Sequence, residues 1–154
     1  MDKTFVAVDI ETTGIAVTRD RIIEIGGAKY INGELKEKFN ELIDPGCIIP
    51  PFIEHLTGIR NSDVKGKRNV DSVIKDFVAF AEGFPLLGHN INFDYSFLKQ
   101  YAVNGKLTFE HLVIDTVKIA RKKYPDLPSR KLNDLCDYRS EERRVGKECR
   151  SRWS

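Results

Sequence analysis

Residues 4–14 read TFVAVDIETTG, a short apolar run that ends on two acidic residues. The part from Thr4 to Ile10 is rich in β-branched residues and predicts a buried strand. Side chains two apart on a strand share a face, so Asp9 and Glu11 are expected to point the same way. Two like charges that close repel unless a cation lies between them, and hard oxygen ligands suit Mg²⁺ or Mn²⁺. The alternative is a solvated acidic strand end.

The next two strands are predicted to form a hairpin. Residues 21–30 (RIIEIGGAKY) indicate a second strand, in which Gly26-Gly27 suggests a β-bulge. Asn32-Gly33 is typical of a tight hairpin turn and leads into Glu34 to Ile43, where polar and apolar residues alternate. The chain is therefore expected to open as a three-stranded antiparallel meander.

Beyond residue 69 the apolar residues recur at helical spacing. They predict a helix from Val70 to Ala81 with Asn69 as its cap. Elements of both kinds then alternate, which predicts an α/β fold with helices covering a mixed five-stranded sheet. The later expected elements are a strand at 85–88, a helix from about Phe93 that Asn104-Gly105 ends, a strand at 112–114, a helix near 116–122 and a last helix capped by Ser129.

A second group of polar residues, His89-Asn90-Ile91-Asn92-Phe93-Asp94, lies at the expected strand-to-helix junction. Asn92 as a helix cap and Asp94 near the positive helix end would explain these residues structurally. Among other polar residues we expect roles in the fold or on the surface rather than in chemistry. They are Glu24 as a hydrogen-bonded carboxylate, His111 in solvent, Asp115 as a helix cap, and residues 121–123 as an exposed basic helix end.

The positive charge of the chain is concentrated at its C-terminal end. The net charge is +2, and residues 139–154 hold six Lys or Arg against three Glu, so residues 1–138 carry 19 positive and 20 negative charges. Overall charge therefore gives no argument for nucleic-acid binding. Residues 139–154 contain one aliphatic residue and no periodicity, which predicts a disordered tail after a single domain of residues 1–138.

The sequence also limits the compartment in which the chain is expected. No apolar run approaches the about 18 residues that a membrane helix needs. The three cysteines are widely separated and odd in number, so they form neither a disulfide framework nor a metal knuckle. We expect a cytoplasmic protein.

Four segments in order and in register resemble the DEDDh (DnaQ-like) 3′-5′ exonuclease family. They are DIETTG at 9–14, HNINFD at 89–94, DTVKIAR at 115–121 and YPDLPSRKLNDLC at 124–136. The resemblance covers residues 1–138 and is strongest to the epsilon-subunit and PolC-type proofreading domains of bacterial DNA polymerase III. It implies an RNase H-like fold.

The resemblance implies two-metal hydrolysis of phosphodiester bonds at the 3′ end of single-stranded DNA, with two Mg²⁺ or Mn²⁺ ions roughly 4 Å apart. Asp9 would bridge both ions, Glu11 would bind one, and Asp94 would act through a water. The residues expected to contact the substrate are Thr12, Thr13, Gly14, His55, Leu56 and Asn90, and the alternative for Leu56 is a core position.

The resemblance stops after Tyr138. The family continues to a His and, five residues later, an Asp, which serve as general base and fourth carboxylate, whereas residues 139–154 contain neither residue type. His89 and Asp94 share that spacing, but Asp94 already belongs to the second motif. We therefore expect the exonuclease domain to be truncated here, with its final helix missing, and residues 139–154 to be foreign to it. Catalysis by the 154-residue chain would be severely impaired.

Several functions remain open at this point. The chain is either an exonuclease or a module that grips a 3′ end without cutting it, and an oligoribonuclease-like action on RNA remains possible. An interaction domain with no nucleic-acid role is disfavoured because Asp9, Glu11 and Asp94 are all present. Free-standing, polymerase-associated and polymerase- or helicase-fused parents all fit the sequence.

Overall fold

The computed structural model of this chain describes residues 3–143, and side chains as far as Asp137. The strands are β1 (Phe5–Thr12), β2 (Ile22–Ile31), β3 (Glu34–Leu42), β4 (Leu86–Gly88) and β5 (Val113–Asp115). The helices are α1 (Pro51–Thr57), α2 (Asn61–Val64), α3 (Val70–Ala81), α4 (Ile91–Asn104), α5 (Thr116–Lys123) and α6 (Leu132–Arg143).

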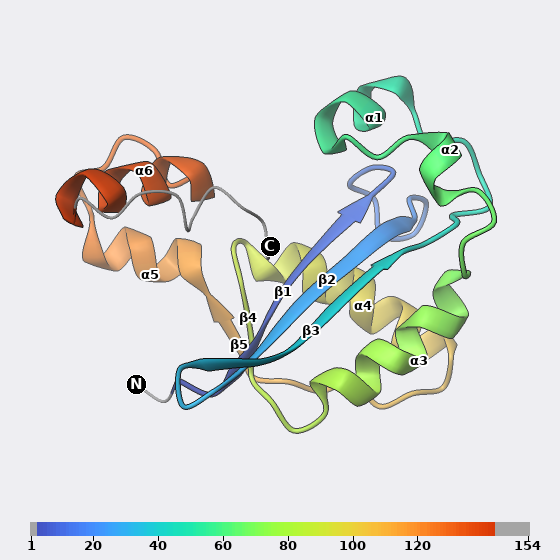
Figure 1. Cartoon of the computed structure of the whole chain (residues 1–154), viewed down its shortest axis with the longest axis horizontal. Helices are drawn as coiled ribbons and strands as arrows, with labels where there is room; N and C mark the ends of the chain where they lie inside the picture. The colour runs from blue at the N-terminus through green and yellow to red at the C-terminus, as the bar shows by residue number, and fades with distance from the viewer. Residues whose placement is uncertain (1–2, 144–154) are drawn as a thin grey trace.

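The strands form one mixed sheet in the order β3-β2-β1-β4-β5 (Figure 1). β2 pairs antiparallel with β1 and β3, whereas β4 pairs parallel with β1 and with β5. The predicted α/β class, with a meander followed by parallel strands, is therefore confirmed. β3 forms one edge of this sheet, and its first residues, ELKEK at 34–38, are all exposed.

The hairpin between β2 and β3 is confirmed, but the predicted bulge at Gly26-Gly27 is wrong. Asn32 and Gly33 both have positive φ (54° and 84°), as a two-residue hairpin turn requires. The register between β1 and β2 is regular through both glycines of the predicted bulge. Gly27 serves packing instead, because a Cβ there would lie 2.9 Å from the Phe80 ring. Its missing side chain lets α3 approach the sheet.

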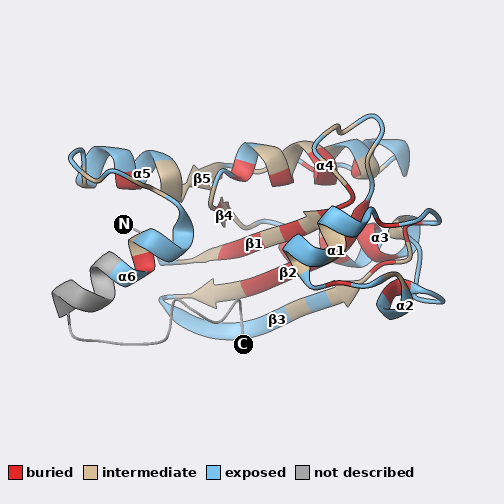
Figure 2. Cartoon of the chain, turned by 90° about the horizontal axis from the view of Figure 1, so that it is seen from above, coloured by how far each residue is buried: buried red, intermediate tan, exposed pale blue. Residues whose placement is uncertain are grey.

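The main core lies between the sheet and the helices α3 and α4. Val6, Val8 and Ile10 alternate along β1 and belong to this core, together with Phe77 of α3 and Phe97 of α4. Figure 2 shows the buried residues on the strands and on the sides of these helices that face them. One face of β1 is therefore committed to packing, and the residues between these positions lie on the other face.

The helices α3 and α4, which cover the main core, begin differently from one another. Asn69 caps α3 as predicted, because its side chain accepts a hydrogen bond from Ser72 N–H at 3.0 Å. α4 begins at Ile91 and ends at Asn104, so the predicted end is confirmed and Asn92 is not its cap. The residue before α4 is Asn90, in the left-handed conformation.

Two short helices, α1 and α2, were not predicted. A second, smaller cluster holds them against the sheet, with Ile23, Ile49, Ile59 and Val64 buried together. The side chain of Asn61 closes the loop, since it accepts from Ile49 N–H at 2.7 Å and donates to Ile49 C=O at 3.1 Å. These helices lie beyond the carboxyl end of β1 (Figure 1).

The C-terminal helix differs from its prediction at both ends. α6 begins at Leu132, and Ser129 is not its cap: the Ser129 hydroxyl contacts Asp134 and accepts from Lys131 N–H at 3.4 Å. α6 continues to Arg143, so a disordered tail from residue 139 is wrong for residues 139–143. The rest of the predicted tail, 144–154, lies outside the described residues. No helix in the described part is long and apolar enough to cross a membrane.

Candidate metal and nucleic-acid site

Two acidic residues lie near the carboxyl end of β1 on the face opposite the main core. Asp9 and Glu11 alternate with the core residues Val8 and Ile10, and both are half-buried. Strand geometry separates their Cα atoms by roughly 7 Å and gives their side chains a common direction. The predicted shared face is present.

The third predicted acid, Asp94, reaches the same point of β1 from α4. β4 pairs only with Val6 and Ala7 of β1 and ends at Gly88, so the edge of β1 beyond this point has no strand beside it. There the Ile10 N–H donates to Asp94 Oδ1 at 3.4 Å, and Asp94 is 4% exposed. The Asp94 carboxylate therefore lies beside the backbone unit between Asp9 and Glu11.

A fourth carboxylate lies beside this group on the neighbouring strand β2. Glu24 of β2 is directly opposite Glu11 in the antiparallel register, and Gly26 is opposite Asp9. Side chains in such cross-strand pairs share a face, and like charges in this position repel. Glu24 was predicted to be a structural carboxylate. Its position adds a fourth carboxylate beside Glu11.

The chemistry of these side chains fits a divalent cation. Carboxylate oxygens are the ligands that Mg²⁺ and Mn²⁺ prefer, and a cation between them relieves their repulsion. Within residues 3–143 no three His, Cys, Asp or Glu side chains form a ready-made metal cluster.

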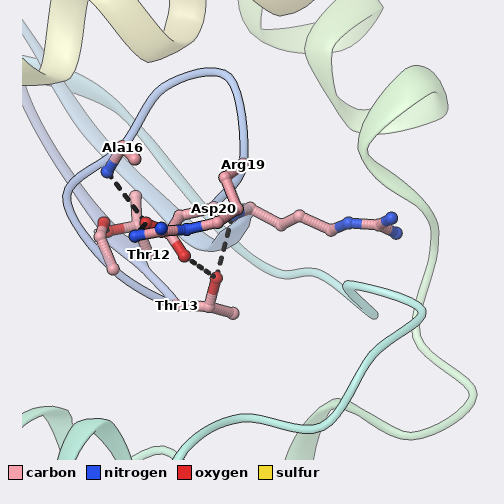
Figure 3. A network of polar contacts seen from close by, with 7 residues as sticks. Thr12, Thr13, Ala16, Arg19 and Asp20 are labelled. Carbon is pink, nitrogen blue, oxygen red and sulfur yellow. Dashed lines mark hydrogen bonds and ion pairs between the residues drawn. The ribbon is translucent and has the colours of Figure 1, made fainter.

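The loop from β1 to β2 is held by a network of polar contacts centred on Asp20 (Figure 3). Asp20 Oδ2 accepts from Ala16 N–H at 2.8 Å, and the Thr13 hydroxyl lies 3.5 Å from Asp20 Oδ1. The Thr13 hydroxyl also accepts from Arg21 N–H at 2.9 Å, and the Thr12 hydroxyl donates to Gly14 C=O at 2.5 Å. Both threonine hydroxyls are therefore engaged within the loop, and their predicted contact with a nucleotide stays a prediction.

Asp20 was not predicted to matter, and Gly14 explains how it fits. A Cβ on Gly14 would lie 2.4 Å from Asp20 Oδ2, so the missing side chain makes room for this carboxylate. In the sequence, the only indication of this fit is a glycine followed by an acid within one short loop. Here the glycine permits a close approach inside the loop itself.

Gly14→Ala is expected to destabilise the chain by about 1–3 kcal/mol, because Asp20 would have to leave Ala16 N–H and the Thr13 hydroxyl. Urea unfolding followed by circular dichroism measures this loss. Gly105→Ala is the matched control: a Cβ there meets no atom closer than 3.5 Å, and the φ of −81° suits alanine. The control is expected to stay within about 0.5 kcal/mol of the parent. Equal losses in the two variants would contradict the role of Gly14.

The predicted substrate residues of the HLTG segment lie exposed on α1. Leu56 is 67% exposed, so the alternative of a core position is wrong, and His55 is exposed as well. Phe52, one turn earlier, is 71% exposed, and Ile15 of the β1–β2 loop is 83% exposed. α1 thus presents apolar side chains to solvent near the end of β1, which suits contact with a base.

The junction between β4 and α4 carries the remaining predicted residue, Asn90. It is exposed, and its backbone N–H donates to Asp115 Oδ1 at 3.0 Å. Asp115 also caps α5, as predicted, by accepting from Val117 N–H at 2.9 Å. His89 Nδ1 lies 2.9 Å from the Thr116 hydroxyl. Thus β5 and α5 contact the turn that leads to Asp94.

His111 differs from its prediction as a solvated residue. Its Nδ1 lies 2.8 Å from Phe84 C=O, and its ring packs edge-on against Phe109. The predicted exposed basic helix end is confirmed for residues 121–123. None of these residues lies in the group around Asp9.

Two groups with shifted pKa values lie in later turns of α4. The hydrogen bond that Lys99 donates to Glu110 raises the pKa of Lys99, and burial raises the pKa of Tyr101. Both shifts arise from packing and pairing beyond the turn that carries Asp94.

Comparison with known proteins gives one consistent answer. A family profile described as an exonuclease (RNase T) matches residues 6–144. A DNA polymerase III of PolC type from Caldanaerobacter subterraneus subsp. tengcongensis is 41% identical over 138 residues, which is 90% of this chain and 10% of that protein. The chain thus spans about a tenth of the length of the curated relatives it matches.

Solved structures support the fold. Exonuclease X in complex with 5′-overhanging duplex DNA superposes with a TM-score of 0.67 at 22% identity, covering 94% of this chain and 75% of that chain. A zinc-bound complex of Escherichia coli exonuclease I with single-stranded DNA gives a TM-score of 0.76 at 20% identity, covering 89% and 35%. These neighbours have the RNase H-like fold that the resemblance implied, so that expectation is confirmed.

Proposed function

Because this chain belongs to the RNase T exonuclease family, whose members are hydrolases, we propose that it carries the 3′-5′ exonuclease site of a PolC-type DNA polymerase III. Its substrate would be the 3′ end of single-stranded DNA, and its role in replication would be proofreading. In this proposal the chain acts in the cytoplasm, as part of a longer polymerase.

The position of Asp94 is the observation that best supports the proposal. Ile10 and Asp94 are 84 positions apart in the sequence, yet the Ile10 N–H donates to Asp94 Oδ1. This contact lies between the two acids of β1. A sheet needs no buried acid at this point for its own pairing. A carboxylate 4% exposed beside two others is costly unless a cation or hydrogen bonds compensate it.

Asp9, Glu11 and Asp94 are proposed to hold two divalent ions, Mg²⁺ or Mn²⁺. When bound, such ions stabilise the charge that develops on the phosphate and make hydroxide available near neutral pH. The protein's part is to fix the carboxylates: Asp9 and Glu11 through the pleat of β1, and Asp94 through the first turn of α4.

The substrate would lie over the loop and helix at the end of β1. The β1–β2 loop, with Thr12, Thr13 and Gly14, would contact the terminal nucleotide through its backbone, because its hydroxyls are already engaged. His55 and Leu56 on α1 would meet the terminal base, since both are exposed there. Asn90 would contact the substrate from the β4–α4 turn.

Binding without efficient cleavage is the second candidate function for the 154-residue polypeptide. Its three histidines are His55, His89 and His111, and the last two are held by Thr116 and by Phe84 C=O. Residues 139–154 add no His or Asp. Without a general base, we expect only a trace rate on single-stranded DNA.

Metal binding tests the site independently of turnover. Mn²⁺ is expected to raise the unfolding midpoint of the chain. At a free Mn²⁺ concentration of 100 times the dissociation constant, the free energy of unfolding should rise by about 2.7 kcal/mol. Asp94→Ala should weaken Mn²⁺ binding at least about tenfold, as measured from the EPR signal of free Mn²⁺. Asp126→Ala, at an exposed position, is the matched control and should bind Mn²⁺ normally. Equal Mn²⁺ affinity in both variants would refute the site.

A further inference from the structure

We propose that Asp115 is a positioning residue for Asp94, acting through the turn between β4 and α4. This inference rests on the metal site proposed above. Asp115 touches neither Asp94 nor Ile10 in the contacts described, and its effect would come from fixing the start of α4.

A single oxygen of Asp115 joins two helices. Asp115 Oδ1 accepts from Val117 N–H at 2.9 Å, which caps α5, and from Asn90 N–H at 3.0 Å, which precedes α4. A residue that only capped its own helix would need the first contact alone. The second contact crosses to a different element, 25 residues away along the chain.

The next residue strengthens the same connection. The Thr116 hydroxyl donates to Gly88 C=O at 3.2 Å and lies 2.9 Å from His89 Nδ1. Gly88 lies close to β1, because a Cβ there would lie 3.1 Å from Val8 C=O. Asp115 and Thr116, which are consecutive residues, therefore hold the β4–α4 turn to the start of α5.

The start of α4 depends on these outside contacts. Asn90, at the cap position, has φ 59° and ψ 46°, and its side chain makes no capping hydrogen bond. Its C=O accepts from Phe93 N–H at 3.1 Å, which begins the first turn. Asn tolerates the left-handed conformation, yet nothing in its own side chain holds it there. The hydrogen bond from Asn90 N–H to Asp115 supplies that constraint.

Asp94 is one turn beyond Asn90, so a small rotation of this turn moves its carboxylate. The contact with Ile10 N–H is 3.4 Å, at the long end of a hydrogen bond, and leaves little tolerance. Residues that orient a metal ligand from outside typically change metal affinity by about 10–100-fold when removed. Asp115 is expected to act in this range.

The test compares variants that differ in the shared acceptor. Asp115→Ala is expected to weaken Mn²⁺ binding by about tenfold or more in the 154-residue chain, by the EPR signal of free Mn²⁺. Asp115→Asn keeps one oxygen that can accept both N–H groups, so it should restore affinity close to the parent. Thr116→Val, which removes the hydroxyl but keeps the shape, should also weaken Mn²⁺ binding. This variant provides the test if Asp115→Ala does not fold.

Asn69→Ala is the matched control, because it removes the cap of α3 without touching the β4–α4 turn. Asn69→Ala should lower the unfolding midpoint, as the loss of a helix cap does. It should leave the Mn²⁺ affinity and the NMR chemical shift of the Ile10 amide unchanged. Asp115→Ala should move that amide shift. Parent-like Mn²⁺ affinity in folded Asp115→Ala, or in Thr116→Val, would overturn the inference.

The outcome for Asp94→Ala separates the two proposals. If Asp94→Ala removes Mn²⁺ binding while Asp115→Ala keeps it, only the positioning role is wrong. If Asp94→Ala binds Mn²⁺ normally, the proposed metal site is wrong and the positioning role is overturned with it.

Discussion

Extending the chain with a C-terminal segment that carries a His and, five residues later, an Asp is expected to raise its rate on single-stranded DNA by about 10²–10⁴-fold. The expected reason is that the added His would supply a general base for the reaction. Of the histidines in the described residues, His89 and His111 are held by other groups, and His55 is exposed on α1. None is positioned by a contact to Asp9, Glu11 or Asp94 in the hydrogen bonds described.

The measurement is the shortening of a 5′-labelled oligonucleotide from its 3′ end in the presence of Mn²⁺. The control extension is the same segment with its His and Asp both replaced by Ala, which separates chemistry from any gain in packing. If the unextended chain cuts as fast as the extended one, a base already exists among residues 1–154 and the expectation of impaired catalysis is wrong.

Asp9→Ala in the extended chain is expected to lower the rate by at least about 10³-fold. Asp9 is the acid proposed to contact both ions, and the charge stabilisation that such ions supply is worth several kcal/mol in the transition state. The loss should fall mainly on kcat, since α1 and the β1–β2 loop, which are proposed to grip the 3′ end, are unchanged.

Single-turnover cleavage measures the rate of the chemical step, and fluorescence anisotropy of a labelled 3′ end measures binding. Together they separate a loss in kcat from a loss of binding. Asp126→Ala in the same extended chain provides the control for removal of an exposed carboxylate. A residual rate in Asp9→Ala within about tenfold of the parent would show that Asp9 contributes far less than a shared metal ligand should.

The sequence was informative where the signal was local. Asn32-Gly33 predicted its hairpin because both positions need positive φ, and Asn69 predicted a cap because a polar side chain precedes a helical apolar pattern. The pair of acids at the end of β1 was also visible, since alternation along a strand decides which side chains share a face.

Features that depend on distant contacts were not predicted. α1 and α2 have only 7 and 4 residues, too few for a periodic pattern, and the contacts of Asn61 with Ile49 that hold them cross a loop. His111 was expected in solvent because nothing nearby in the sequence reveals Phe84 C=O beside it. Gly26-Gly27 indicated a bulge, whereas the space beside Gly27 is filled from α3.

The meeting of Asp94 with β1 was predictable only through family resemblance. Its physical cause is that β4 stops at Gly88 while β1 continues to Thr12, which leaves Ile10 N–H available at the strand edge. Strand lengths in a sheet are set by packing of the whole domain, and no local pattern in the sequence encodes this difference.

The exposed charges of β3 have a consequence for self-association. A terminal strand offers its outward N–H and C=O groups to any extended chain that approaches, which is the usual start of fibrillar assembly. A second molecule docking on β3 would have to strip water from the Lys and Glu side chains of ELKEK at 34–38. These five residues have no role in catalysis here, but they oppose pairing of β3 with the edge strand of a second copy of the domain.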